Sequence, residues 1–268
     1  MMRGPVEARV SGKCRIAISV PTSKDLDYNR RSWPNYAEAV RQAGGTPVEI
    51  GLTLSETELM ELARACDGVL LPGSPADVNP ERYGQQPTAA CAPSDPAREV
   101  ADRLLLEEAY AAKKPVLAIC YGVQSLNVWR GGSLVQDLSR TAVNHSAGAG
   151  VAVAHAISLQ AGGILSGLAE AGEEILSGDE PRLLVNSSHH QAVELPGDGL
   201  HVVAVSSQDG VVEAIEATGD ANSPEFVVGV QWHPERSVDI SATSRAIFEA
   251  LMAAAAKAGR NGVPRRER

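Results

Sequence analysis

One stretch decides the fold: Lys114-Pro115-Val116-Leu117-Ala118-Ile119-Cys120-Tyr121-Gly122-Val123-Gln124-Ser125-Leu126-Asn127. Its short apolar run, Val116 to Ile119, predicts a buried strand, and helical spacing of apolar residues begins directly after Cys120. A cysteine at such a corner, with the small residues Ala118 and Gly122 on either side, is typical of a nucleophile elbow. The helix amino terminus would favour the thiolate through its dipole and free N–H groups. The competing interpretation makes Cys120 a buried small hydrophobic residue.

Strands and helices alternate outward from this stretch. The other expected strands are 15–20, 47–50, 69–71 and 226–232. We expect a polar loop with Arg30 and Arg31, followed by a helix from Pro34 to Ala43. A second helix should follow the capping box Ser55–Glu58 and bury Leu59, Leu62 and Cys66. A third should begin at Asp95-Pro96 and bury Val100, Leu104 and Ala111, and a last one is expected from about 239 to 256. This alternation predicts a mainly parallel sheet with helices on both faces.

Three β-like runs between 151 and 215 change the pattern. They cover residues 151–159, 183–195 and 201–215, and the last is broken by the turn signal Gln208-Asp209-Gly210. We expect them to form an antiparallel β extension of the same domain. The predicted fold class is therefore α/β, with a mainly parallel central sheet flanked by helices. A single domain is expected from 15 to 257, with residues 1–14 and 258–268 as loose tails.

Composition excludes several classes of protein. The net charge of −9 and an aromatic content of 4% argue against a nucleic-acid surface. Four cysteines without paired spacing favour a reducing compartment over a disulfide or zinc framework. The first apolar run, residues 16–20, is too short for a signal-peptide core, and no stretch approaches a membrane span. We expect a soluble cytoplasmic protein without nucleic-acid or membrane partners.

A cysteine nucleophile needs a base, a group that orients the base, and donors for an oxyanion. His233 ends an apolar strand as Cys120 does, and Glu235 lies two residues further on, where its carboxylate can fix the imidazole tautomer. The alternative, purely structural interpretation is that His233 is a strand-end histidine hydrogen-bonded to local backbone and that Glu235 is a solvated surface residue. His189 and His190 are rival bases, whereas no pattern supports a role for His145 or His155.

Several motifs in order resemble the class I glutamine amidotransferase superfamily, closest to its γ-glutamyl-γ-aminobutyrate hydrolase branch. They are the 114–127 stretch with Gly131-Gly132-Ser133-Leu134-Val135-Gln136-Asp137-Leu138, then Leu71-Pro72-Gly73-Ser74-Pro75-Ala76-Asp77-Val78-Asn79-Pro80, Val185-Asn186-Ser187-Ser188-His189-His190-Gln191, and Gly229-Val230-Gln231-Trp232-His233-Pro234-Glu235. The resemblance spans nearly the whole chain and implies a flavodoxin-like sheet. Two residues depart from the pattern: Ala118 replaces the usual leading glycine, and Tyr121 replaces the arginine common in the hydrolase branch.

The resemblance implies a site and a reaction. The implied catalytic residues are Cys120, His233 and Glu235, the implied oxyanion donors are the backbone N–H groups of Gly73 and Tyr121, and the implied glutamyl-binding residues are Gln124, Ser188 and His189. The implied reaction is hydrolysis of the γ-glutamyl amide bond of a small γ-glutamyl compound through a cysteine thioester, without metal or cofactor. A homodimer is also a family expectation.

Three functions compete on this site. The leading one is a free-standing hydrolase, because no synthetase domain or nucleotide loop is evident in the sequence. The second is a glutaminase subunit that supplies ammonia from glutamine to a partner synthetase, and the third is a catalytically silent binding protein. The amine half of the substrate would meet residues 28–33 and 79–83, where Arg30 and Arg31 either bind a leaving-group carboxylate or are plain surface charge.

Overall fold

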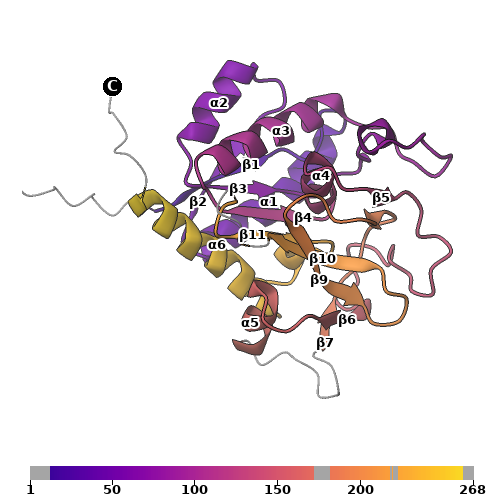
Figure 1. Cartoon of the computed structure of the whole chain (residues 1–268). Helices are drawn as coiled ribbons and strands as arrows, with labels where there is room; N and C mark the ends of the chain where they lie inside the picture. Colours follow the sequence, from indigo (N-terminus) through magenta and orange to yellow (C-terminus); the bar gives the residue numbers. More distant parts are fainter. Residues whose placement is uncertain (1–12, 172–181, 218, 220–222, 262–268) are drawn as a thin grey trace, which may run out of the picture.

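A nine-stranded sheet forms the centre of the protein in the computed structural model, which describes residues 13–171, 182–217, 219 and 223–261 (Figure 1). The strands of this sheet are β1 (Arg15–Ser19), β2 (Thr46–Ile50), β3 (Gly68–Leu71), β4 (Val116–Ile119), β6 (His155–Leu159), β7 (Arg182–Val185), β9 (Leu200–Ser206), β10 (Val212–Ala217) and β11 (Val227–Val230). Their order is β2-β1-β3-β4-β11-β10-β9-β6-β7, and β5 (Leu134–Val135) pairs with β8 (Ala192–Val193) separately.

The first five strands in this order are parallel. If these five strands are renumbered 1 to 5 in the order in which they occur along the chain, their order across the sheet is 2-1-3-4-5, which is the flavodoxin-like arrangement. The inner strands β3, β4 and β11 are short apolar runs buried on both faces, whereas β2 lies at the edge of the sheet and is only partly buried. The predicted α/β class with a mainly parallel sheet is confirmed.

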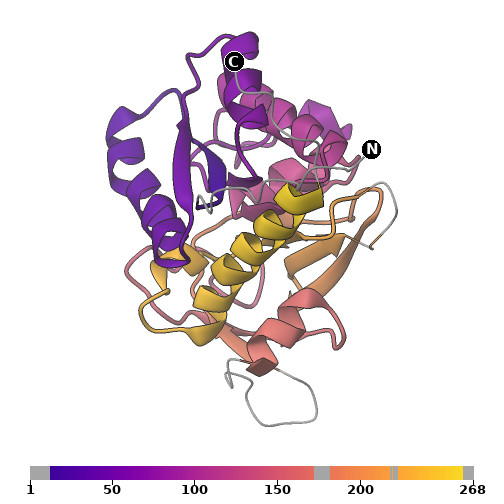
Figure 2. The same ribbon diagram turned by 90° about the vertical axis from the view of Figure 1, so that its left-hand side faces the viewer.

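Helices cover both faces of the parallel strands, as the two views show (Figures 1 and 2). The helices are α1 (Leu26–Gln42), α2 (Glu56–Arg64), α3 (Pro96–Ala111), α4 (Tyr121–Trp129), α5 (Ile164–Ala171) and α6 (Ala242–Asn261). Successive side chains of a strand point to opposite faces. Ile16 and Ile18 therefore pack with α1 and α6, whereas Ala17 packs with α2 and α3.

The remaining strands continue the same sheet in antiparallel fashion. β10 pairs with β11 on one side and with β9 on the other, and β6 and β7 complete the edge. The hairpin between β9 and β10 contains the predicted turn at Gln208-Asp209-Gly210, where Gly210 has a φ of +72°. The predicted antiparallel extension is therefore confirmed, and it shares hydrogen bonds with the parallel strands.

The first helix is longer than predicted. It begins after Asp25, whose side chain accepts a hydrogen bond from the Tyr28 N–H, so the expected polar loop around Arg30 and Arg31 is helical. Pro34, expected to start the helix, lies inside it. The Asp25 cap overrides the local signal at Pro34 because it begins the helix earlier.

Two other predictions about helices need correction, and one helix is not predicted at all. Of the residues predicted to face inward on α3, Leu104 is buried as expected, but Val100 and Ala111 are exposed. The helix also buries Ala101, Leu105 and Ala109, so its buried stripe is centred about one position further along the chain. α6 continues to Asn261, so residues 258–261 are helical instead of a tail, while 1–12 and 262–268 lie outside the described residues. α5 is not predicted from the sequence. By contrast, the capping box Ser55–Glu58 and the Asp95 cap are both present.

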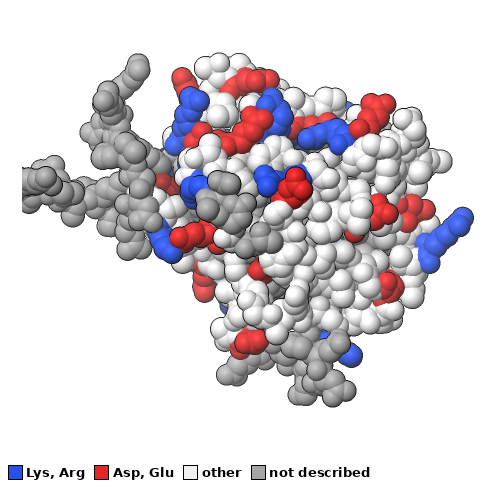
Figure 3. All heavy atoms as spheres, in the orientation of Figure 1, with Lys and Arg blue, Asp and Glu red and all other residues white. Residues whose placement is uncertain are grey.

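Basic and acidic side chains are mixed over α2 and α3 on the face drawn in Figure 3. Arg103 of α3 lies 2.9 Å from Glu107 on the same helix and 3.8 Å from Glu56 of α2. Arg64 of α2 lies 3.8 Å from Glu108 of α3. Among the described helices, none has the length and apolar character needed to cross a membrane.

Candidate active site

Cys120 occupies a strained corner between β4 and α4. Its φ of +54° and ψ of −110° lie in a region that residues with a side chain rarely adopt. Its N–H donates to the Val230 carbonyl at 2.8 Å, which holds the corner against β11. The next turn passes so close to β3 that a Cβ on Gly122 would lie 2.2 Å from the Leu71 oxygen. This explains the glycine there and agrees with the elbow predicted from the sequence.

Three neighbouring strands bring the predicted residues to one edge of the sheet. β3, β4 and β11 lie side by side and parallel, so their carboxyl ends meet at the same edge. Gly73 follows β3, Cys120 follows β4 and His233 follows β11. A Cβ on Gly73 would lie 3.0 Å from His233 Cε1 and 3.5 Å from Cys120 Cβ, so Gly73 lies against both side chains.

His233 lies between a thiol and a carboxylate. Its Nδ1 is 2.8 Å from Glu235 Oε1, and the Cys120 side chain lies close enough to the ring to affect its charge. Burial disfavours the imidazolium, but the negative charges of Glu235 and Cys120 outweigh burial and raise the pKa of His233 to about 9. The structure thus brings together the three residues proposed for catalysis.

Asn186 fixes the backbone of His233. Its Oδ1 accepts from the His233 N–H at 2.9 Å, and its Nδ2 donates to the His233 carbonyl at 2.8 Å. Asn186 is buried and follows β7, 47 residues before His233. Sequence reasoning assigns it no role, because an asparagine in a loop gives no local signal for such a long-range clamp.

The two expected oxyanion donors differ in whether the backbone N–H already has a hydrogen-bond acceptor. Tyr121 is the first residue of α4, so its N–H has no acceptor within the helix. The Gly73 N–H instead donates to the hydroxyl of Tyr36, at 3.0 Å. Tyr36 is buried on α1, and burial raises its pKa well above the usual value, so the hydroxyl stays neutral. For Gly73 to stabilise an oxyanion, its N–H must leave Tyr36.

A buried arginine supports the loop that contains Gly73. Arg98 of α3 has no exposed surface, and its guanidinium donates to the carbonyls of Pro72 at 2.6 Å and Pro21 at 2.8 Å. Asp102, one turn later, accepts from Arg98 Nε at 2.7 Å, and the guanidinium lies 4.7 Å from the centre of the Tyr121 ring. The sequence predicts a helix here but not this function, since an arginine on a helix is usually solvated.

A cavity of about 240 Å³ opens at this edge of the sheet. Cys120, Gln124, Ser188, His189 and His233 all line it, so the residues implied for glutamyl binding lie beside the thiol. The Gln124 amide nitrogen donates to the Gln191 carbonyl at 3.1 Å and to Gln231 Oε1 at 3.2 Å. These two bonds use both amide protons, which leaves the Gln124 carbonyl oxygen as the group that a substrate could meet.

His189 forms part of the cavity wall, but both of its ring nitrogens face protein oxygens. Nδ1 is 2.9 Å from the Gln191 carbonyl, and Nε2 is 3.5 Å from Glu213 Oε1. His190, the other rival base, has its Nε2 2.9 Å from Asp77 Oδ1, and this hydrogen bond raises the pKa of His190. Neither ring has the position of His233, whose ring lies close enough to Cys120 for the thiol to affect its pKa.

Charged groups of both signs line the cavity. Asp77 is buried, and Arg236, which follows Glu235 in a short 3-10 turn (Pro234–Arg236), lines the cavity as well. Arg30, one of the two arginines considered for a substrate carboxylate, instead pairs with Asp27 on the surface of α1 at 2.6 Å. The sequence pointed to Arg30 because it lies in a polar run, whereas Arg236 is brought in by the turn after β11.

Comparisons with known proteins show similarity over most of the chain. Residues 17–235 match the family described as peptidase C26. A γ-glutamyl-γ-aminobutyrate hydrolase of Escherichia coli O157:H7 is 35% identical over 228 residues, covering 82% of this chain and 84% of the relative. A glutamine amidotransferase-like protein of Lactococcus lactis subsp. lactis is 33% identical over 228 residues, covering 84% of this chain and 87% of the relative.

A solved structure shares the fold. The structure, described as a GMP synthase subunit of Thermoplasma acidophilum, matches with a TM-score of 0.63, and the match covers 94% of this chain and 98% of that protein. At 15% identity, this likeness concerns the arrangement of strands and helices alone.

Proposed function

We propose that this chain, which belongs to the peptidase C26 family of class I glutamine amidotransferase-like proteins, hydrolyses the γ-glutamyl amide bond of a small γ-glutamyl compound. The family and the relatives named γ-glutamyl-γ-aminobutyrate hydrolase make the chain a hydrolase. The bond cleaved, the nucleophile and the substrate are our proposal. The observation that supports it most strongly is that Cys120 and the hydrogen-bonded pair of His233 and Glu235 lie together beside one cavity.

The first half of the reaction forms a thioester. The Cys120 thiolate, paired with the protonated ring of His233, attacks the γ-carbonyl carbon, and the tetrahedral oxyanion is held by the N–H groups of Tyr121 and Gly73. His233 then gives the proton to the departing amine as the C–N bond breaks. Glu235 keeps Nδ1 protonated, so that Nε2 exchanges the proton.

Water completes the reaction. His233, now neutral, takes a proton from a water molecule, which attacks the thioester carbonyl. The second tetrahedral intermediate collapses with departure of the Cys120 thiolate, and glutamate leaves after its new γ-carboxyl group loses a proton to solvent. His233 keeps the proton that it took from water, which restores the thiolate–imidazolium pair. Each turnover thus consumes one amide and one water and releases glutamate and an amine, without an external oxidant or cofactor.

The cavity supports a substrate with charged ends. A γ-glutamyl amide carries an α-ammonium and an α-carboxylate, and γ-glutamyl-γ-aminobutyrate carries a second carboxylate. We assign Asp77 to the ammonium and Arg236 to a carboxylate, because these are buried or half-buried charges on the cavity wall. The 240 Å³ of space is suited to a small molecule and not to a folded protein substrate.

A substrate screen with the purified chain tests this proposal. We expect turnover of γ-glutamyl-γ-aminobutyrate, little or no turnover of its α-glutamyl isomer, and accumulation of a glutamyl adduct on Cys120 that is visible by mass spectrometry of the quenched enzyme. Cys120→Ser should lower kcat by several powers of ten. Cys66→Ala, a buried cysteine packed between α2 and the sheet, is the matched control and should retain activity. Full activity in Cys120→Ser would refute the mechanism.

The second candidate function is a glutaminase subunit that supplies ammonia to a partner synthetase. Two observations favour it: relatives are named as glutamine amidotransferase-like proteins, and the residue after Cys120 is Tyr121 in place of the arginine common in the hydrolase branch. A glutaminase subunit would hydrolyse glutamine in preference to γ-glutamyl-γ-aminobutyrate. Its activity would also rise on addition of a partner synthetase. The same screen therefore separates the two functions, since both predict loss of activity in Cys120→Ser but differ in the preferred amide.

A further inference from the structure

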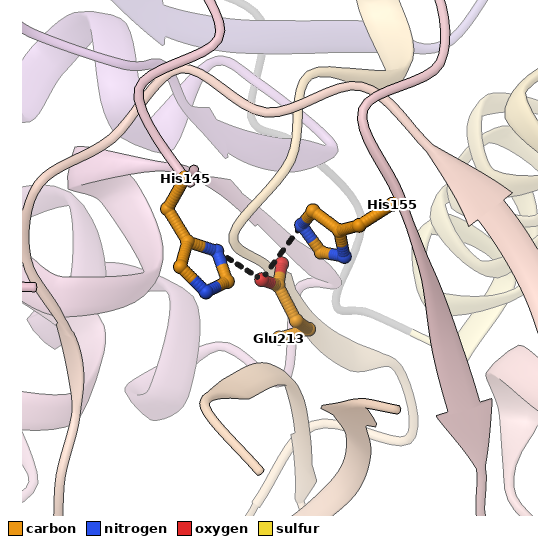
Figure 4. Close-up of side chains that lie close together, drawn as sticks. All are labelled: His145, His155 and Glu213. Carbon is orange, nitrogen blue, oxygen red and sulfur yellow. Dashed lines mark ion pairs between the residues drawn. The ribbon is translucent and has the colours of Figure 1, made fainter. Parts of the chain in front are cut away.

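Three histidines surround one buried glutamate behind the wall of the cavity. Glu213 Oε1, on β10, is 3.2 Å from His145 Nδ1, 3.3 Å from His155 Nε2 and 3.5 Å from His189 Nε2. Figure 4 shows His145 and His155 pointing at the Glu213 carboxylate from separate segments of the chain. Among the described residues, these three nitrogens and the Glu213 oxygens have no hydrogen bond of regular geometry, and their close polar contacts are with one another. Five buried polar atoms that contact only one another are costly unless a proton or a metal ion lies among them.

In each of the three rings, the nitrogen that points away from Glu213, here called the outer nitrogen, determines the tautomer. Each faces an oxygen: Asp209 Oδ2 for His145 at 3.2 Å, the Ala156 carbonyl for His155 at 3.3 Å, and the Gln191 carbonyl for His189 at 2.9 Å. Carboxylate and carbonyl oxygens only accept, so each outer nitrogen carries the proton. In a neutral ring, the inner nitrogen then directs a lone pair at Glu213 Oε1. Lone pairs that converge on a carboxylate repel one another unless a cation lies between them.

We propose that His145, His155 and Glu213 bind a divalent transition-metal ion of the zinc class. One ligand atom from each of the three residues lies within 4.8 Å of the others. In a tetrahedral zinc site with bonds of about 2.0–2.1 Å, ligand atoms are about 3.3–3.4 Å apart, which is close to the 3.2 and 3.3 Å from Glu213 Oε1 to the two imidazole nitrogens. His189 Nε2, 3.5 Å from the same oxygen, or a water supplies the fourth ligand.

The chemistry of the donors selects the class of ion. Two imidazoles and one carboxylate suit zinc and its first-row neighbours, whereas magnesium and calcium prefer oxygen ligands throughout. Asp209 and the Ala156 carbonyl hold the outer N–H groups of His145 and His155, as carboxylates and carbonyls commonly do behind metal-bound histidines. No sequence motif marks the site, because its residues are far apart along the chain.

The ion would have a structural role for the cavity. The cavity is lined by His189 but by none of the three proposed ligands. The His189 N–H donates to the His145 carbonyl at 2.9 Å, and Ser187 Oγ donates to the same carbonyl at 2.7 Å. A metal ion would therefore fix the loop that contains His145 to β10 and, through it, the wall segment 187–190.

Metal content and zinc-dependent stability test the proposal. We would use Cys120→Ser as the reference, because the thiol beside His233 is a competing zinc ligand. After loading with Zn²⁺ and removal of the excess, we expect about one zinc per chain and a Tm that rises with Zn²⁺. Glu213→Gln in the same background should weaken zinc binding by at least about 100-fold and abolish the rise in Tm.

Glu216→Gln is the matched control. Glu216 is also buried on β10, but its carboxylate accepts from the N–H groups of Ile164 and Leu165 instead of facing the three histidines. We expect this variant to keep its zinc. Zinc binding that is equal in the Glu213 and Glu216 variants, or the absence of any bound zinc in the reference protein, would overturn the proposal and leave the cluster as protonated imidazoles around Glu213.

A crystallographic measurement does not depend on the folding of any Glu213 variant. Crystals of Cys120→Ser grown with Zn²⁺ should give an anomalous peak at the zinc edge between His145, His155 and Glu213. A peak only at His233, or none, would contradict the assignment even if Glu213→Gln failed to fold.

Discussion

At the scale of single residues, the candidate active site shows which features can be recognised from the local sequence. Cys120 is recognisable because the strand, the corner and the helix that define its role are consecutive in the chain. Asn186 is not, because its role depends on two hydrogen bonds with a residue 47 positions away. The proposed metal-binding role of His155 and Glu213 cannot be predicted from the sequence for the same reason. Tertiary contacts between distant polar residues produce no periodic pattern that could reveal them.

Protonation of His233 should stabilise the fold within a defined pH range. Its pKa is raised from the ordinary 6.5 to about 9, so the stabilisation is fully present below about pH 6.5 and is lost as pH rises through about 9. This change in pKa corresponds to about 3 kcal/mol in the free energy of unfolding. Urea unfolding of the wild-type chain at about pH 6 and about pH 10 measures the loss.

Glu235→Gln is the control for this prediction. It removes the charge that contributes most to raising the pKa of His233 and keeps the shape of the side chain. We expect the loss of stability between the two pH values to fall to less than about half of that in the wild-type chain. An identical pH dependence in both proteins would show that the carboxylate does not hold the imidazolium.

At the scale of elements, α3 provides two ion pairs with the same spacing and different surroundings. Arg98 and Asp102 are fully buried, whereas Arg103 and Glu107 are 37% and 46% exposed. Arg98→Ala should lower the free energy of unfolding by about 3–5 kcal/mol, because it leaves the Asp102 charge buried without its partner. Arg103→Ala should cost less than about 1 kcal/mol, since solvent screens the exposed pair. Chemical denaturation of both variants measures the difference.

Activity gives an independent readout on the same helix. Arg98 donates to the Pro72 carbonyl next to Gly73, so Arg98→Ala should also lower kcat at a temperature where the variant is still folded. Arg103→Ala should leave kcat unchanged. Equal stability and equal kcat in the two variants would mean that the buried pair does not support the loop.

Element boundaries are less predictable than element types. The strands follow from apolar runs, because strands buried on both faces must be apolar along their whole length. The start of α1 is misplaced because Pro34 gives a strong local signal for a first turn, whereas the true cap is Asp25. The buried stripe of α3 is misassigned because the helix also buries Arg98 and Asp102, two charged residues that a hydrophobic pattern counts as exposed.

At the scale of the whole molecule, the continuous sheet joins the parallel and antiparallel halves. β11 pairs with β4 on one side and with β10 on the other, so backbone hydrogen bonds cross the boundary between the halves. We propose that residues 15–257 unfold as one cooperative unit. Differential scanning calorimetry should then give a single transition with equal calorimetric and van't Hoff enthalpies. Two separated transitions would show that the antiparallel strands form an independent domain.

The bond between the Gly73 N–H and the Tyr36 hydroxyl has a consequence for selectivity. In the absence of a ligand, the phenol caps a backbone dipole that would otherwise attract any small anion from solution. If the Gly73 N–H binds the oxyanion as we propose, a carbonyl compound interacts with this dipole only when it enters the cavity deeply enough to displace the phenol. Short amides that do not fill the cavity would leave the Tyr36 hydroxyl bonded to Gly73. The chain would therefore hydrolyse such amides slowly and would select for longer ones.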